Sequence, residues 1–451
     1  MSRAFTSRDI AATGGTVAAV LFRQFVDEDL GCGSYLVADE QAGVAAVIDP
    51  AYAIEQYLDA GVEIVLVLET HTHADHVSGH GRFALEHGVP VRVHEAAGAA
   101  FSHEPLRDGE EIVFGDVRIR VVHTPGHRPE HCAFVVDGEL VLTGDSLFVG
   151  DAARPDLAVE AQEGAEGLFH SLRRLTELGD GVTVYPGHVA GSLCGANLSP
   201  ERSTTIGRER AENAALIATH EEFMCRATGP QPPRPPNMES IVELNRGPFL
   251  AAQPPLARVD DATDGVALDV RDAETYARGH RAGAVNVPVS GSSFGTKSAF
   301  VLPPSRPIVL EAGSEDDAQE AAKRLRAVGI FGIAGWREPA ADETLEPVSV
   351  DELERLLADD AVQLYDVREK DERDLGFIPG STHLPYRNAR QAAENGLCDS
   401  RPIVTICESG QRAAIAASVL QSAGVDARPV LGGGVATWNG EKYSFRRCGG
   451  S

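Results

Sequence analysis

Four potential metal ligands stand within six residues of the chain, in the stretch HTHADH at residues 71–76. Imidazole and carboxylate side chains bind zinc, iron and related metals. Because successive side chains of an extended segment alternate in direction, the first two histidines point to the same side of the chain. A polar loop without metal is the competing interpretation, but a cluster this dense favours a metal site. The four ligands are His71, His73, Asp75 and His76.

Three further potential ligands follow downstream, each after a short apolar run. Apolar runs bounded by turn residues indicate buried strands. The loop after a strand end is held rigidly while its side chains stay accessible, which suits a binding site. We therefore expect strand ends to bring the downstream ligands to the same centre as HTHADH. They are His127 in TPGH, Asp145 in TGD and His188 in YPGH.

A second place for chemistry lies near the end of the chain. The apolar run 403–406 leads into CESGQR at residues 407–412, and the residues after it predict a helix over 413–423. A loop between a strand and a helix start directs backbone N–H groups inward, which stabilises a negatively charged sulfur. Arg412 adds a positive charge. Together these features favour a nucleophilic Cys407 over an inert buried cysteine.

Apolar periodicity around these motifs predicts the elements that position them. A strand precedes HTHADH, and helical spacing follows it. Further strands and helices alternate along the rest of this half. The predicted strands cover residues 16–25, 33–48, 62–70, 91–94, 112–122 and 133–136, and the predicted helices cover 54–60, 76–87, 161–178 and 209–225.

Several single residues near the ligands receive a more ordinary interpretation. His80 and His87 fall within the predicted helix 76–87, so we expect them to be exposed or to cap the helix. Cys32 is expected to be structural. His123 and His131 are near enough to the ligands in sequence to help orient them.

Composition limits the class of protein. The 451 residues are enough for about three domains. A formal net charge of −27 opposes binding to phosphate backbones or anionic lipid. No apolar run is long enough to cross a bilayer, and residues 1–10 lack the apolar core of a signal peptide. Seven scattered cysteines form no disulfide framework, so we expect a reducing, cytoplasmic location.

The second half of the chain contains a repeat. The tripeptide DVR recurs 97 residues later, and a glycine and a proline downstream recur with the same spacing. Each copy alternates strand and helix patterns over the length of a small domain, which predicts a parallel sheet covered by helices. The matching pairs are Asp269 and Asp366, Gly283 and Gly380, and Pro288 and Pro385.

The order HxHxDH, TPGH, TGD and YPGH resembles the metallo-β-lactamase superfamily over about the first 245 residues. This resemblance implies an αββα sandwich with its metal at one edge of the two sheets. The two copies in the second half resemble rhodanese domains, through DVR and the turn and strand that follow. The implied fold class is α/β, with an αββα sandwich over 1–249 and rhodanese-like domains with parallel sheets over 250–343 and 344–451.

The two rhodanese-like copies differ where chemistry is expected. An ungapped alignment places Ala312 at the position of Cys407 and Asp317 at the position of Arg412. The first copy therefore lacks both the nucleophile and the cation. We expect it to be catalytically inactive, with a role in packing or docking.

The ligand types allow two kinds of metal centre. A facial triad of His71, His127 and Asp145 suits one non-haem Fe(II) per chain and leaves positions open for O₂ and substrate. Alternatively, all seven ligands hold two zinc ions that activate water, as a resemblance to hydroxyacylglutathione hydrolases implies. Four residues orient the ligands if the centre holds one iron, and are ligands themselves if it holds two zinc ions. They are His73, Asp75, His76 and His188.

The residues after Asp145 favour the iron centre. They read SLFVGDAARPDL, similar to the GD…GRPD stretch of persulfide dioxygenases, with Ala153 where that family has glycine. A fused sulfur-transferring domain also favours the iron centre. The whole chain resembles persulfide dioxygenase–rhodanese fusion proteins with one inactive and one active rhodanese unit.

That resemblance implies a reaction at two sites. A low-molecular-weight thiol persulfide reacts with O₂ at Fe(II) to give sulfite and the free thiol. Cys407 takes sulfane sulfur from a second persulfide and transfers it to sulfite, which gives thiosulfate and detoxifies sulfide. The expected partners are thus thiol persulfide, O₂ and sulfite, without nucleic acid or membrane, and a homo-oligomer is compatible with the pattern.

Two residues are candidates for contacting substrate or sulfur. Arg154 is expected either to bind the anionic substrate or to pair with Asp151 or Asp156. Cys194 lies in the glycine-rich segment at residues 191–195, where glycines allow close backbone approach. It is expected either to relay sulfur or to pack as a small apolar residue.

Overall fold

The computed structural model describes residues 20–189, 198–229, 231, 233–303, 306–397, 401–440, 442 and 443. The chain divides into two compact units, Met1–Gln253 with Arg326–Gly329, and Pro254–Leu325 with Ile330–Ser451. The predicted boundary at 249 lies close to this division, while the boundary at 343 falls inside the second unit and stays a prediction. None of the helices in the described ranges is long and apolar enough to cross a membrane.

The first unit opens with a six-stranded sheet in the order β1-β2-β3-β4-β5-β6. β1, β2 and β3 pair antiparallel, and β3 to β6 pair parallel. Every residue of β2 is buried, as expected for a strand with both faces covered. The elements are β1 (Val20–Val26), β2 (Gly33–Asp39), β3 (Val44–Ile48), α1 (Glu55–Leu58), β4 (Glu63–Leu68), α2 (His80–His87), β5 (Val91–His94), η1 (Glu95–Ala97) and β6 (Glu104–Leu106).

A second six-stranded sheet follows in the order β12-β11-β10-β9-β8-β7. In β8, Val117, Ile119 and Val121 are buried while the arginines between them are exposed, which is the alternation of a strand covered on one face. The elements are β7 (Glu111–Phe114), β8 (Val117–His123), β9 (Cys132–Val136), β10 (Leu140–Gly144), α3 (Ala161–Leu175), β11 (Thr183–Pro186), β12 (Thr204–Thr205), α4 (Ile206–Glu212), α5 (Ala214–Ile217), α6 (His220–Ala227) and α7 (Met238–Arg246).

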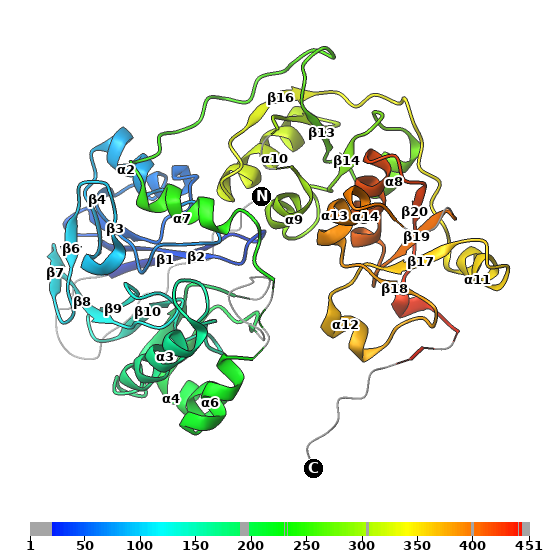
Figure 1. Ribbon diagram of the computed structural model, residues 1–451. Coiled ribbons are helices and arrows are strands. Elements are labelled where there is room, and N and C mark those ends of the chain that lie inside the picture. The colour runs from blue at the N-terminus through cyan, green and yellow to red at the C-terminus, as the bar shows by residue number, and fades with distance from the viewer. Residues whose placement is uncertain are drawn as a thin grey trace. The chain divides into compact units, whose positions relative to one another are not determined.

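The two sheets face each other, with helices on their outer sides (Figure 1). One apolar cluster, which includes Val37, Leu68 and Phe134, fills the space between the sheets. A second cluster packs α1 and α2 on the first sheet, and a third packs α3 and α6 on the second sheet. These layers confirm the predicted αββα sandwich.

Two predicted elements are each divided in the structure. The predicted strand 33–48 is two strands, β2 and β3, with a turn that uses the left-handed conformation of Gly43 (φ +70°). The predicted helix 209–225 is three short helices, since Asn213 and Thr219 cap α5 and α6 with their side chains. Apolar periodicity revealed these segments but not the turns within them.

The second unit contains two four-stranded parallel sheets with the same topology, β14-β13-β15-β16 and β18-β17-β19-β20. This confirms the predicted rhodanese-like parallel sheets. The first repeat has β13 (Val266–Asp269), α8 (Ala273–Arg278), β14 (Val285–Asn286), α9 (Phe294–Val301), β15 (Ile308–Glu311), α10 (Glu315–Ala327) and β16 (Ile333–Arg337). The second has α11 (Val350–Ala358), β17 (Gln363–Asp366), α12 (Lys370–Leu375), β18 (Thr382–His383), η2 (Tyr386–Asn388), α13 (Ala389–Glu394), β19 (Ile403–Ile406), α14 (Gln411–Ser422), β20 (Ala427–Pro429) and η3 (Val435–Thr437).

The two repeats share one apolar core. A single cluster of buried side chains includes Phe294 and Leu310 of the first repeat together with Val367 and Ile415 of the second. The backbone N–H of Asn286 also donates to the hydroxyl of Ser418 on α14 (3.0 Å). The repeats therefore pack as one body.

Candidate functional site

Strand ends of the first unit bring His71, His127 and Asp145 together. One ligand atom of each lies within 4.8 Å of the others, and all three side chains are buried. Asp145 Oδ2 lies 4.0 Å from His71 Nε2 and 3.6 Å from His127 Nε2. His71 Nε2 and Asp145 Oδ2 have no hydrogen-bond partner. Buried polar atoms are normally paired, so two that point at each other without a bond indicate a shared ligand.

The distances fit a metal ion. Two atoms bound at about 2.1 Å to one metal lie roughly 3.0–3.4 Å apart at bond angles near 90–109°, and further apart at wider angles. The separation of 3.6 Å from His127 Nε2 is slightly above that range, the separation of 4.0 Å from His71 Nε2 requires a wider angle, and both are longer than a hydrogen bond. Two imidazoles and one carboxylate therefore form a donor set that can hold one divalent transition metal.

Asp49 fixes the tautomer of His71 through the hydroxyl of Thr70. The hydroxyl of Thr70 donates to Asp49 Oδ2 (2.8 Å), so its oxygen accepts from His71 Nδ1 (2.9 Å). Asp49 Oδ1 also accepts the backbone N–H of Thr70 (2.7 Å). With the proton on Nδ1, the lone pair of His71 Nε2 faces the metal position. Burial holds the pKa of His71 well below its usual value, which keeps the ring neutral.

The loop after β10 orients His127. His127 Nδ1 donates to the backbone carbonyl of Arg154 (2.9 Å), which leaves Nε2 free to bind metal. The guanidinium of Arg154 pairs with both carboxylate oxygens of Asp156 (2.7 and 2.9 Å). Arg154 thus makes one of the two ion pairs considered for it, its role in binding an anionic substrate stays a prediction, and its main chain positions a ligand.

His188 lies between two carboxylates. Its Nδ1 is 2.7 Å from Asp145 Oδ1, and its Nε2 is 2.7 Å from Asp75 Oδ2. Each ring nitrogen of His188 is thus within hydrogen-bond distance of a carboxylate oxygen. Burial would raise the pKa of Asp145, but the positive His188 ring and its hydrogen bond outweigh burial and hold that pKa at about 2. His188 thus connects Asp145 to Asp75, and its ligand atom lies within 4.8 Å of those of Cys32 and Asp75, a group that could hold a second metal.

His73 turns one ring nitrogen away from the centre. Its Nε2 lies 3.2 Å from Asp49 Oδ1 and 3.1 Å from Glu69 Oε2, both buried. Burial alone would lower the pKa of His73, but these two carboxylates raise it well above its usual value. His73 Nδ1 has no partner. A ligand atom of His73 lies within 4.8 Å of ligand atoms of Asp75 and His76.

Cys32 is a member of this site that the sequence did not reveal. Its sulfur lies 3.1 Å from Asp75 Oδ2, 3.2 Å from His188 Nε2 and 3.5 Å from His76 Nδ1. Cys32 also pairs with His188 through an isolated β-bridge. Burial, followed by the charge of Asp75, raises the pKa of this thiol well above its usual value. The sulfur lies among the groups predicted as second-metal ligands, beyond the structural role expected for it.

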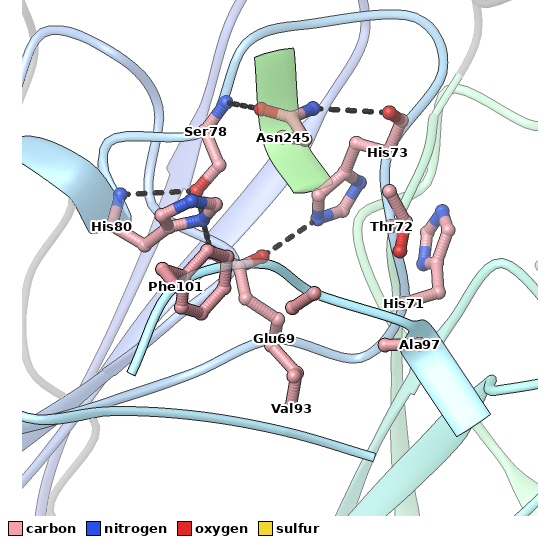
Figure 2. A pocket seen from close by; sticks show the side chains of 11 residues that line it. Glu69, His71, Thr72, His73, Ser78, His80, Val93, Ala97, Phe101 and Asn245 are labelled. Atoms are coloured by element: carbon pink, nitrogen blue, oxygen red, sulfur yellow. Dashed lines mark hydrogen bonds and ion pairs between the residues drawn. The ribbon is translucent and has the colours of Figure 1, made fainter. Parts of the chain in front are cut away.

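Glu69 ties the metal loop to the start of α2. It accepts from Ser78 Oγ (2.5 Å) and contacts His80 Nδ1 (3.0 Å) and His73 Nε2 (3.1 Å), as Figure 2 shows. The expectation that His80 is exposed or caps the helix is wrong, because the ring is buried against Phe101. A cavity of about 10 Å³, room for roughly one water molecule, lies among these residues.

His123 and His131 lie close to the ligands, but His123 faces outward. His131 is buried with its ring centroid 5.2 Å from that of His71, and its Nδ1 bonds to Thr124 Oγ1 (2.8 Å). Burial and the neighbouring His127 lower the pKa of His131 to about 3. His123 Nε2 donates to the backbone carbonyl of Pro129 (2.8 Å). His131 therefore packs behind a ligand, whereas His123 does not approach the metal position.

The Cys407 loop of the second unit connects β19 to α14. Cys407 is buried, and the backbone N–H of Gly410 donates to its sulfur (3.1 Å). Gly410 has a positive φ (102°), which turns that N–H inward. Arg412 is bound by both oxygens of Glu372 (2.5 and 2.6 Å). The positive charge expected at this loop is thus balanced by a carboxylate.

The first repeat lacks these features at the matching loop. Ala312 follows β15 and is buried, and Asp317 accepts a hydrogen bond from the hydroxyl of Ser314 (2.7 Å). The first turn of α10 carries Glu315, Asp316 and Asp317, so negative charge stands where the second repeat has Gln411 and Arg412. Cys194, the proposed sulfur relay, lies outside the described residues, and its role stays a prediction.

Comparisons with known proteins agree with this geometry. The model of the metallo-beta-lactamase superfamily matches residues 28–188. A hydroxyacylglutathione hydrolase of Brucella ovis is 30% identical over 202 residues, which cover 43% of this chain and 76% of the hydrolase. The chain belongs to the metallo-β-lactamase superfamily. The rhodanese-like domain model matches residues 349–441, so the predicted fusion of the two folds is confirmed.

Two further relatives extend the likeness of this metallo-β-lactamase chain. The mitochondrial persulfide dioxygenase ETHE1 of Bos taurus is 29% identical over 247 residues, 53% of this chain and 92% of that protein. The crystal structure of a metallo-beta-lactamase from Staphylococcus aureus subsp. aureus COL has a TM-score of 0.66 and 28% identity, and covers 72% of this chain and 100% of its own. The 72% of this chain that is covered is more than the first unit contains, so the match includes part of the second unit.

Proposed function

We propose that the chain is a non-haem Fe(II) persulfide dioxygenase joined to a sulfurtransferase. The observation that carries this proposal is the His71, His127 and Asp145 triad, whose ligand atoms lie within 4.8 Å of one another and include two buried atoms without a hydrogen-bond partner. A single metal held by two histidines and one carboxylate leaves positions open for two further ligands. The likeness to persulfide dioxygenases and the fused rhodanese-like domain support iron and a sulfur substrate.

His71, His127 and Asp145 would hold the metal, and Fe(II) bound there would supply the redox chemistry that the reaction of O₂ with a thiol persulfide needs. Thr70 and the Arg154 carbonyl hold the two imidazoles in the tautomer that ligation requires. His188 engages Asp145 Oδ1 and so directs Oδ2 to the metal.

The overall reaction balances without another reactant. One thiol persulfide, one O₂ and one water give one free thiol and one sulfurous acid, which ionises to sulfite. The terminal sulfur is oxidised and O₂ is reduced.

At Cys407, the thiolate attacks the terminal sulfur of a second persulfide, its S–S bond breaks and the thiol leaves. Sulfite then attacks the sulfur bound to Cys407, which forms thiosulfate and restores the thiolate. The Gly410 N–H supports the negative sulfur before and after each transfer.

A di-zinc thioester hydrolase is the alternative. The hydrolase of Brucella ovis and the free Nδ1 of His73 favour it, because that nitrogen is available as a further ligand. The ligand atoms of Cys32, Asp75 and His188 also lie within 4.8 Å of one another, so a second metal has candidate ligands there. The likeness to persulfide dioxygenases is what favours the single iron.

Metal analysis and oxygen uptake test the proposal together. Protein purified anaerobically without chelators is expected to contain about one iron per chain. It should consume O₂ when given a thiol persulfide and release sulfite. About two zinc ions per chain, with thioester hydrolysis and no persulfide-dependent O₂ uptake, would contradict the proposal.

A further inference from the structure

The loop that carries the metal ligands is held by a residue far away in the sequence. Asn245 lies on α7, near the end of the first unit, and its side chain is buried. Its Oδ1 accepts the backbone N–H of Ser78 (2.9 Å), and its Nδ2 donates to the carbonyls of His73 (3.0 Å) and His76 (2.8 Å). Figure 2 shows the amide between Ser78 and His73.

These three bonds hold the backbone from His73 to Ser78, the segment that contains Asp75. His73 and His76 flank Asp75, whose carboxylate bonds to His188 and so connects to Asp145. The bonded backbone groups are buried and lie outside any helix or strand ladder, so the Asn245 amide replaces the partners that regular structure would supply.

We infer that Asn245 is a positioning residue of the metal centre. This inference goes beyond the proposed function, since it requires only that the first unit binds a metal. A primary amide suits the task because one oxygen accepts while one NH₂ group donates to two carbonyls. Aspartate has the same shape but loses both donors and sets an anionic oxygen against two carbonyl oxygens. Leucine has a similar volume and makes none of the three bonds.

The packing of α7 gives the amide a fixed direction. Met238, Ile241 and Asn245 are the buried residues of this helix, at the spacing of one helical face. After the helix, Phe249 stacks on Phe101 with centroids 4.5 Å apart, and Phe101 lines the cavity beside His73. The helix and the chain after it thus hold Asn245 against the loop from one side.

The test uses Co(II), whose visible absorption reports ligand geometry, and follows its binding to the metal-free full chain. Asn245→Asp and Asn245→Leu are expected to weaken Co(II) binding about 10- to 100-fold and to change the spectrum, as loss of groups that orient ligands generally does. Asn286→Leu is the matched control. It removes a buried amide that donates to two carbonyls in the second unit, and should leave Co(II) affinity and spectrum unchanged.

A purely structural role for Asn245 predicts a different pattern. Asn245→Asp preserves shape, so a packing role would leave its Co(II) affinity and spectrum equal to those of the parent, and that result overturns the inference. Circular dichroism of the metal-free variants checks folding, and Asn245→Asp decides the matter if Asn245→Leu does not fold. A parent chain that binds Co(II) normally but, loaded with iron, does not oxidise persulfide would refute the proposed activity and leave this inference standing.

Discussion

The metal centre of the first unit and the Cys407 loop of the second unit are built in different ways. The metal centre collects groups from Cys32 to Asn245, on strand ends, loops and a late helix. The Cys407 loop is one contiguous run between β19 and α14, with its charge partner Glu372 supplied from α12. A centre of the first kind depends on many remote contacts, whereas a centre of the second kind depends mainly on its own residues.

Removing a metal ligand should have the largest effect and should separate the two sites. His127→Ala loses one of three converging donors, so we expect persulfide-dependent O₂ uptake to be abolished and bound iron to fall well below one per chain. When sulfite and persulfide are both supplied, thiosulfate should still form at Cys407. His123→Ala is the control, because His123 ends the strand β8 that leads into the loop with His127, and its side chain bonds to the Pro129 carbonyl instead. Iron and O₂ uptake at parent levels in His127→Ala would disprove the assigned triad.

Replacing Cys407 should have the opposite effect to replacing His127: thiosulfate formation is lost and oxygen uptake is kept. Cys407→Ser should reduce thiosulfate formation to the uncatalysed rate, while O₂ uptake continues and sulfite accumulates. The reason is that serine offers no sulfur to carry the transferred atom. Cys225→Ser, an exposed cysteine on α6, should change neither product. Thiosulfate from Cys407→Ser at the parent rate would show that transfer takes place elsewhere.

Loss of the Thr70 hydroxyl should have an intermediate effect on the metal centre. Thr70→Val removes the hydroxyl between Asp49 and His71, so we expect iron or Co(II) affinity to fall about 10- to 100-fold. Thr124→Val removes a similar buried hydroxyl, which contacts the non-ligand His131, and is the matched comparison. Equal metal affinity in the two variants would mean that the tautomer of His71 needs no such support.

The smallest effect is expected from rebuilding the inactive repeat. Ala312→Cys with Asp317→Arg restores the two missing residue types but leaves Glu315 and Asp316 in the first turn of α10. Their negative charge opposes an anionic sulfur at this helix start. Oxygen uptake and thiosulfate yield should therefore match those of the parent. A second transfer activity that persists when Cys407→Ser is added would show that a contiguous loop needs only these two residues.

The difference between the contiguous Cys407 loop and the dispersed metal centre explains what could be predicted from the sequence. The αββα sandwich was expected from the resemblance of the motif order to the metallo-β-lactamase superfamily, and the parallel sheets from alternating strand and helix patterns. Cys407 was found with its loop because strand, cysteine, glycine and helix are adjacent in the chain. The convergence of His71, His127 and Asp145 was expected because each follows a predicted strand.

What the sequence did not reveal is the set of contacts that orient the ligands. Asp49 and Asn245 act through hydrogen bonds across long sequence separations, which leave no local pattern. Glu69 lies only four residues before His73, but the two are not in one helix, so no periodicity pairs them. His80 was misplaced because helical spacing identifies a face of a helix but not the buried Glu69 that the ring meets. The positive charge of Arg412 was predicted, but Glu372, which neutralises it, lies on another helix.

The apolar core shared by the two rhodanese-like repeats bears on how the chain unfolds. Phe294 and Leu310 pack in the same cluster as Val367 and Ile415, so neither repeat can melt without exposing apolar surface of the other. Calorimetry should therefore resolve one cooperative transition for both repeats, separate from that of the metallo-β-lactamase unit. By the same argument, a second repeat produced alone, from residue 344 onward, would expose a hydrophobic face and tend to aggregate. The first repeat, which has Ala312 where the second has Cys407, thus contributes to the stability of the second repeat through their common core.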